Sequence, residues 1–201
     1  MEYLVLGFFT GISLILAIGA QNIFVIEQGL KKQHVFIVCL ICSLSDLILI
    51  FLGIFLFHYL NQYFNQTVEL IFNILLIIFL LHFIYTKIKT HYSDINFHNE
   101  LTSISKTNII IKTLGFTYLN PHVYSDTVFF LGNFSKNYLL NQKISFGIGA
   151  ASASFLFFFT LGYLSNYLSR YANSKKIWKV INIFIICFMS ILTLFIIKEI
   201  L

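Results

Sequence analysis

One apolar run decides the fold class of this chain: Val35-Phe-Ile-Val-Cys-Leu-Ile-Cys-Ser-Leu-Ser-Asp46-Leu-Ile-Leu-Ile-Phe-Leu-Gly-Ile-Phe-Leu-Phe57. A helix of this length, rising 1.5 Å per residue, crosses a hydrocarbon core of about 30 Å. Asp46 lies in its middle, although an acid near the bilayer centre costs roughly 2.5–3.5 kcal/mol on insertion scales. The run therefore predicts a membrane-spanning helix that carries part of a functional site.

The composition extends this prediction to the whole chain. Its 201 residues are 58% hydrophobic and 10% charged, whereas soluble domains carry about 25% charged residues. Six apolar segments stand out, at residues 3–26, 35–60, 68–86, 108–131, 144–168 and 178–197. We expect an all-α membrane protein with six transmembrane helices in a single domain, residues 1–201, embedded in a lipid bilayer. The basic residues lie in short clusters between the segments, so the net charge of +5 does not indicate nucleic-acid binding.

The segments divide into two groups of three. A polar stretch at about 87–107 separates a first repeat, about 1–90, from a second, about 108–201, and we interpret it as a connecting loop. A shift of 109 positions aligns three pairs: Ser43 with Ser152, Ser45 with Ser154, and Leu52-Gly53 with Leu161-Gly162. Two repeats with an odd number of spans have opposite orientations. This pattern is typical of transporters that bind substrate near the midplane between inverted repeats, although Phe155 matches Asp46.

The basic residues also predict the orientation of the spans. Ten of the 13 lie in or beside the odd-numbered loops: Lys31, Lys32, Lys87, Lys89, Lys106, Lys112, Arg170, Lys175, Lys176 and Lys179. Because cytoplasmic loops carry the excess of Lys and Arg, we expect these loops in the cytoplasm and both termini outside.

Small and polar residues form a stripe on the second span. Cys39, Cys42, Ser43, Asp46 and Gly53 recur at helical spacing, so the stripe is expected to face other helices. Asp46 would then point into the bundle, as part of a site or as a structural acid bonded to a neighbouring helix. The cysteines also permit an intramembrane thiol redox carrier, although burial in an apolar helix disfavours thiol reactivity and favours a packing role.

The fourth span contains a second acid next to a helix break. Pro121 lacks an N–H group, and such a break is tolerated in a membrane only against protein or a water-filled cavity. The half-helix that starts there could receive a carboxylate at its N-terminus. His122 and Asp126, four positions apart, share one face, and Asn120 precedes the proline.

Polar amides also interrupt the first span, at Gln21 and Asn22. Both follow Gly19, which permits local unwinding, and both need hydrogen-bond partners on other helices or on a ligand. In the fifth span, Ser152 and Ser154 belong to a small-residue face that favours close packing, with ligand contact as the alternative.

Four blocks of the chain together resemble the lysine/arginine exporter family (LysE/ArgO type). They are Gly19-Ala20-Gln21-Asn22 with Gln28-Gly29, Cys42-Ser43-Leu44-Ser45-Asp46, Asn120-Pro121-His122-Val123-Tyr124 with Asp126, and Ala151-Ser152-Ala153-Ser154. The resemblance spans nearly the whole chain and implies export of basic L-amino acids across a bacterial inner membrane. Ala17 and Ala20 stand where prolines are common in the family, so the resemblance does not by itself imply a broken first span.

The chemistry of the side chains is consistent with this implied function. Asp46 and Asp126 supply negative charge for a cationic substrate, while Gln21, Asn22, Ser43, Asn120, Pro121 and His122 are the other candidate binding or coupling residues. Export of a cation against an inside-negative potential requires coupling, most simply to proton influx, which makes the protein an antiporter. We expect no enzymatic activity, cofactor or metal. Other small amino-acid-like solutes remain alternative substrates, and the oligomeric state, a homo-oligomer included, is left open.

Overall fold

The computed structural model describes residues 1–16, 19–60, 66–92, 105–172 and 175–200, and these ranges are helical apart from short connections. In chain order the elements are α1 (Glu2–Ile15), α2 (Ala20–Lys31), α3 (Val35–Leu60), α4 (Gln66–Tyr92), α6 (Lys106–Tyr118), α7 (Pro121–Tyr124), the π-helical η1 (Ser125–Phe130), α8 (Leu131–Phe134), α9 (Leu140–Leu168), the 3₁₀ turn η2 (Ser169–Ala172) and α10 (Lys175–Ile200). The described residues form no strand, which confirms the prediction of an all-α protein.

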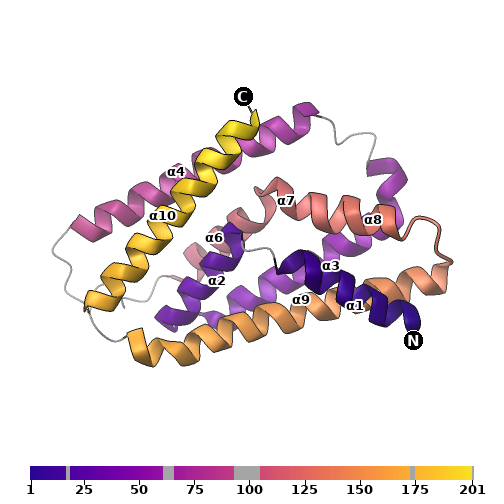
Figure 1. The fold of residues 1–201 in the computed structure, drawn as a ribbon, viewed down its shortest axis with the longest axis horizontal. Coiled ribbons are helices and arrows are strands. Elements are labelled where there is room, and N and C mark those ends of the chain that lie inside the picture. The colour runs from indigo at the N-terminus through magenta and orange to yellow at the C-terminus, as the bar shows by residue number, and fades with distance from the viewer. Residues whose placement is uncertain (17–18, 61–65, 93–104, 173–174, 201) are drawn as a thin grey trace.

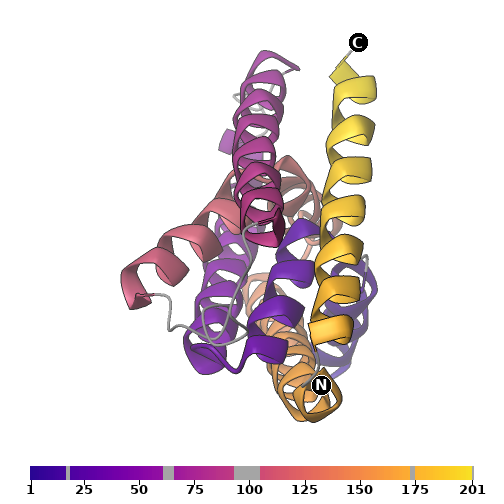
Figure 2. The ribbon, with the colours of Figure 1, turned by 90° about the vertical axis from the view of Figure 1, so that its left-hand side faces the viewer.

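The helices pack in layers around α2. On one side, α9 contacts α1, α2 and α3. On the other side, α4 and α10 run side by side and contact each other (Figures 1 and 2). Between these layers, α2 also contacts α6 and α10, while η1 and α8 pack against α3. Helices from both halves of the sequence therefore enclose the short, polar helix α2.

The expected first span is two helices rather than one. The axes of α1 and α2 differ in direction by 83°, and Gly19, which precedes α2, is extended with φ −115° and ψ −176°. The only proline in the chain is Pro121, so proline does not cause this break. The side chain of Asn22 donates to the carbonyl of Ile15 at 3.3 Å, which satisfies one of the acceptors left at the end of α1.

Several helices are long and apolar enough to cross a membrane. Among the described residues these are Val35–Phe57, Leu140–Tyr171 and Lys179–Lys198, with α1 and α2 as a fourth, bent candidate. In α4, the apolar part Asn73–Thr86 is shorter. The expected segment 108–131 is divided at Asn120 into α6 and the helical stretch α7–η1–α8. The helices thus show a membrane protein, while six crossings remain a prediction.

The two ends of the stretch expected as a loop, at 87–107, are helical. α4 continues through Tyr92, and α6 begins at Lys106 after the N-cap Ser105, whose Oγ accepts from the N–H of Asn108 at 3.3 Å. Residues 93–104 of this expected loop lie outside the described residues. The alternation of Lys and His with apolar residues near Tyr92 suits a solvated helical end as well as a loop, which explains the error.

Candidate functional site

A cavity of about 400 Å³ lies at the junction of the two broken helical segments. Its wall is formed by the end of α1, the start of α2, the middle of α3, the stretch from Asn120 to α8, and single turns of α4, α9 and α10. Charged or titratable side chains on this wall are Asp46, Asp126 and His122. Among the described residues no Lys or Arg lines it, so the cavity offers negative charge without a fixed cation.

Asp46 comes from the small-residue face of α3 and is only 3% exposed. The hydroxyl of Ser154 on α9 donates to its Oδ2 at 2.7 Å. A hydrogen bond to a buried carboxylate is stronger than one between neutral groups and also fixes the orientation of the carboxylate. One oxygen of Asp46 is thus held by the protein, and the same side chain lines the cavity.

Asp126 reaches the cavity from the π-helical segment η1 and is half-buried. π-Helical segments are rare in proteins, and those that occur are often found at functional sites. A close backbone approach holds η1 against α3, because a Cβ built on Gly53 would collide with the carbonyl oxygen of Val128. His122, one turn before Asp126, is exposed and lines the same cavity. Asp126 therefore lies on an irregular helix that is pressed against the helix of Asp46.

Side chains on either side of the break before Pro121 form hydrogen bonds with backbone groups there. Oδ1 of Asn120 accepts the N–H of His122 at 3.1 Å, which caps the start of α7. The phenol of Tyr124 donates to the carbonyl of Tyr118 at 2.9 Å, on the other side of the break. Pro121 occupies the first helical position, where its missing N–H costs nothing. The broken helix is therefore a built feature of the site.

The cavity brings together six of the eight side chains selected from the sequence: Gln21, Asn22, Asp46, Asn120, His122 and Asp126. Pro121 is buried and does not line it, and its contribution is the helix break. Ser43 is fully buried and does not line it either, since its hydroxyl donates to the carbonyl of Cys39 at 2.8 Å.

The sequence as a whole matches the family model described as LysE type translocator over residues 12–199. The chain belongs to the LysE family. It is similar to proteins named arginine exporter protein ArgO: 35% identical over 181 residues to that of Pectobacterium carotovorum, which covers 89% of this chain and 88% of the relative. The ArgO proteins of Pectobacterium atrosepticum (36% over 184 residues, 89% and 88%) and Salmonella typhimurium (34% over 188 residues, 92% and 88%) match similarly. No solved structure matches the chain.

Membership of the LysE family makes the protein a transporter rather than an enzyme, and its apolar helices make it a multi-pass membrane protein. In this LysE-family chain the cysteines of the stripe are free and buried, and the Cys39 thiol donates to the carbonyl of Phe158 at 3.2 Å. That contact belongs to the packing of α3 on α9.

Sequence reasoning weighed Ser154 mainly as a packing residue and did not select it for the site of this LysE-family transporter. The structure joins it to Asp46, 108 positions away. In the sequence, nothing distinguished Ser154 from Ser152. In the structure, Ser152 is exposed, and its hydroxyl donates to the carbonyl of Ile148 on its own helix. The shifted alignment places Ser154 opposite Ser45, which was the nearest available signal.

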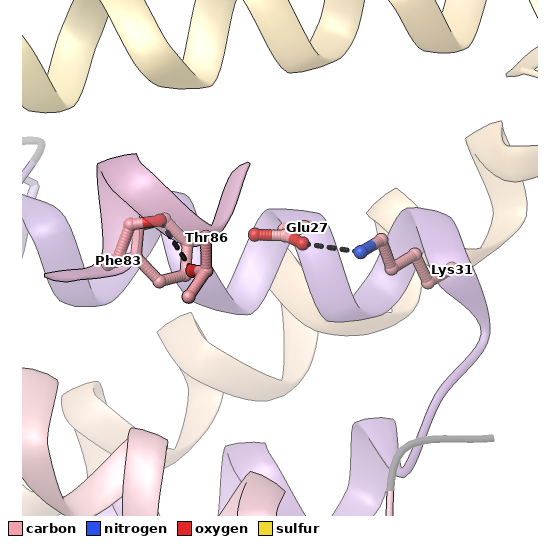
Figure 3. A network of polar contacts seen from close by, with 4 residues as sticks. All are labelled: Glu27, Lys31, Phe83 and Thr86. Carbon is pink, nitrogen blue, oxygen red and sulfur yellow. Dashed lines mark hydrogen bonds and ion pairs between the residues drawn. The ribbon is translucent and has the colours of Figure 1, made fainter. Parts of the chain in front are cut away.

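A charge pair on α2 was also missed. Glu27 is 2% exposed, and its Oε1 lies 2.7 Å from Nζ of Lys31, one turn later (Figure 3). On α4, the hydroxyl of Thr86 donates to the carbonyl of Phe83, also drawn in Figure 3. Glu27 does not line the cavity. The spacing of four residues, acid before base, was the available sequence signal for a helical ion pair.

Proposed function

We propose that the protein exports basic L-amino acids, arginine or lysine, across the bacterial cytoplasmic membrane. The observation that carries the proposal is the pair of acids, Asp46 and Asp126, on one cavity that no described Lys or Arg lines. A guanidinium or ammonium group needs such carboxylates in place of the water it leaves behind. The name of the relatives, arginine exporter, supports the same substrate class.

We further propose that proton influx drives export. Moving one positive charge outward against an inside-negative potential costs about 2.3 kcal/mol per 100 mV, so the membrane potential drives arginine inward through an uncoupled carrier. A carboxylate can hold either a proton or a cationic group, and the two compete for it. Asp46, buried and held by Ser154, is the proposed exchange point, with Asp126 as the second acid for the substrate.

The proposed architecture has six crossings in two inverted three-helix repeats, with both termini outside and the odd-numbered loops in the cytoplasm. The two helix breaks, before Ala20 in the first repeat and before Pro121 in the second, support binding near the midplane. Alternating access would then move the repeats around the cavity.

Efflux from proteoliposomes tests both parts of this proposal. Vesicles loaded with labelled arginine are expected to release it faster when an inward proton gradient is imposed, and Asp46→Asn is expected to abolish that acceleration. Protein-free vesicles and vesicles loaded with labelled glutamate are the controls. Arginine and lysine efflux no faster than in protein-free vesicles would contradict export of basic amino acids. An arginine efflux rate that does not change when the proton gradient is imposed would contradict proton coupling but not export of basic amino acids.

A further inference from the structure

A second hollow, an apolar groove of about 260 Å³, lies between α2 and α10. The described side chains that line it are all aliphatic or aromatic, and none of them lines the cavity of the two acids. Ile23 on α2 is 4% exposed, whereas Val180 and Phe184 on α10 are 65% and 59% exposed. Because Val180 and Phe184 belong to the candidate span Lys179–Lys198, the groove opens toward the lipid of the membrane.

One end of the groove lies at the edge of the membrane. The candidate span Leu140–Tyr171 ends there, and the span Lys179–Lys198 begins there. Figures 1 and 2 both place the end of α2 at the same end of the molecule as the start of α10. Leu30, near the end of α2, and Val180, near the start of α10, line the groove. The groove therefore begins at the level of the lipid headgroups and continues into the apolar layer.

Basic side chains collect at this end of the groove. Lys32 is the C-cap of α2, Arg170 lies in η2, which contacts α2, and Lys179 starts the last candidate span. All three side chains are exposed. Residues 169–185 contain no Asp or Glu. An apolar groove that ends in positive charge is complementary to a molecule with an apolar chain and an anionic head.

Aromatic rings hold the side chain of Arg170. Its Cζ lies 3.5 Å from the ring centroid of Tyr167 and 5.2 Å from that of Tyr171. Stacking of this kind uses the flat face of the guanidinium group, whereas its N–H donors lie in the plane of the group. Those donors match the oxygens of a phosphate, and tyrosines are enriched at the membrane–water interface. Arg170 is thus oriented at the level where lipid phosphates lie.

The charge at the end of the groove favours a lipid over a second copy of the chain. In a symmetric dimer each copy contributes the same surface patch. Two copies docked by this face in one membrane would bring the same basic side chains together, and like charges at an interface repel. A phospholipid instead places its acyl chain in the apolar layer and its phosphate beside those basic groups.

We propose that the groove between α2 and α10 binds an anionic phospholipid, with an acyl chain between the helices and the phosphate at Lys32, Arg170 and Lys179. Both helices also line the cavity, α2 through its first turn and α10 through Phe195 and Ile196. The lipid would therefore bridge two walls of the cavity. The site does not depend on which solute the cavity carries.

Quenching of tryptophan fluorescence by brominated lipids tests this site, because Trp178 is the only tryptophan in the chain and lies two positions before Val180. The full chain is placed in vesicles of one fixed mixture of phosphatidylglycerol and phosphatidylcholine, with bromine on the acyl chains of one lipid or the other. We expect brominated phosphatidylglycerol to quench more strongly at equal mole fraction. Arg170→Gln and Lys179→Gln should each lower this preference about fivefold, as for one basic residue near an anionic membrane surface.

Lys106→Gln is the matched control for charge. Lys106 is also exposed and begins a helix, α6, which Figure 2 shows on the opposite side of the molecule from α10. The preference for phosphatidylglycerol should not change in this variant. Lys31 is kept in every variant, because it pairs with the buried Glu27.

Ile26→Phe tests the groove itself, because Ile26 lines it and the larger side chain fills part of its volume. This variant should also lower the preference, whereas Leu164→Phe, at an exposed position of α9 outside the groove, should not. Equal quenching by the two lipids in the unaltered protein would overturn the site. So would a preference that falls as far in Lys106→Gln as in Lys179→Gln. Fluorescence that neither lipid quenches would mean that a second copy covers the groove, and would also overturn the proposal.

Discussion

At the scale of single residues, the site depends on how Asp46 is held. Its carboxylate is buried in α3, and a hydroxyl from α9 occupies one of its oxygens. That hydroxyl belongs to Ser154. Ser152, two positions before it on α9, is a natural comparison, because it is exposed and its hydroxyl donates to a carbonyl of its own helix. The two serines therefore separate the effect of the bond to Asp46 from the general effect of losing a hydroxyl on this helix.

Replacing Ser154 with Ala is expected to raise the half-saturating concentration of arginine severalfold, because Asp46 loses the donor that orients it. Ser152→Ala should have no effect, and Ser154→Cys, which keeps a weak donor, should fall between. Concentration-dependent efflux gives these constants, and thermal unfolding in detergent shows whether each variant remains folded. A Ser154→Ala protein with an unchanged half-saturating concentration would show that the bond serves packing only.

At the scale of elements, close backbone approach fixes the parts of the site relative to one another. Gly53 on α3 meets Val128 of η1, and a Cβ on Gly132 of α8 would lie 2.7 Å from the carbonyl oxygen of Gly53. The position of Asp126 beside α3 therefore depends on these two glycines. Both are distant in sequence from the two acids, more than one helical turn away.

Gly53→Ala is expected to destabilise the protein by about 1–3 kcal/mol, the usual cost of overpacking, and to lower arginine efflux by displacing η1. Gly115→Ala is the control, because its Cβ would meet the ring of Phe79, a side chain that can move, at 2.7 Å. Thermal unfolding and efflux are measured on both variants. Equal, small effects would show that α3 and η1 tolerate a wider separation than the structure indicates.

At the scale of the whole molecule, the arrangement of the helices in the membrane is the main open prediction. The distribution of Lys and Arg predicts that Lys106 faces the cytoplasm and Lys136 the outside, and both side chains are exposed. Single cysteines at these positions would report on that orientation, in a background with Cys39, Cys42 and Cys187 replaced by Ser.

In intact cells, a membrane-impermeant thiol reagent is expected to label Lys136→Cys, and Lys106→Cys only after the cells are opened. The reverse pattern would invert the proposed topology.

The cysteine-free background is expected to keep most of its arginine efflux, because the described contact of Cys39 is a packing contact that Ser can reproduce. Complete loss of activity in a folded, cysteine-free protein would favour the thiol redox carrier instead.

Much of the site followed from local patterns. An acid inside an apolar run is unusual at any position, so Asp46 and Asp126 were recognisable without a structure, and Pro121 marked the break in the second half by its missing N–H. The bend before α2 was harder to predict, because no proline causes it and Gly19 only permits it. The sequence favoured Ser43 as a binding residue and Ser154 as a packing residue, whereas in the structure it is Ser154 that contacts Asp46.

The sequence by itself determined the helical, membrane-embedded class of this protein and the residues that carry its charge. Hydrophobicity over a continuous segment, and an acid or proline within it, are local properties. Only the tertiary structure decided that Asp46 and Asp126 line one cavity, that Ser154 rather than Ser43 holds Asp46, and that α2 starts uncapped beside them. These relations join residues far apart in the chain, and they are set by which helix faces approach closely enough to pack.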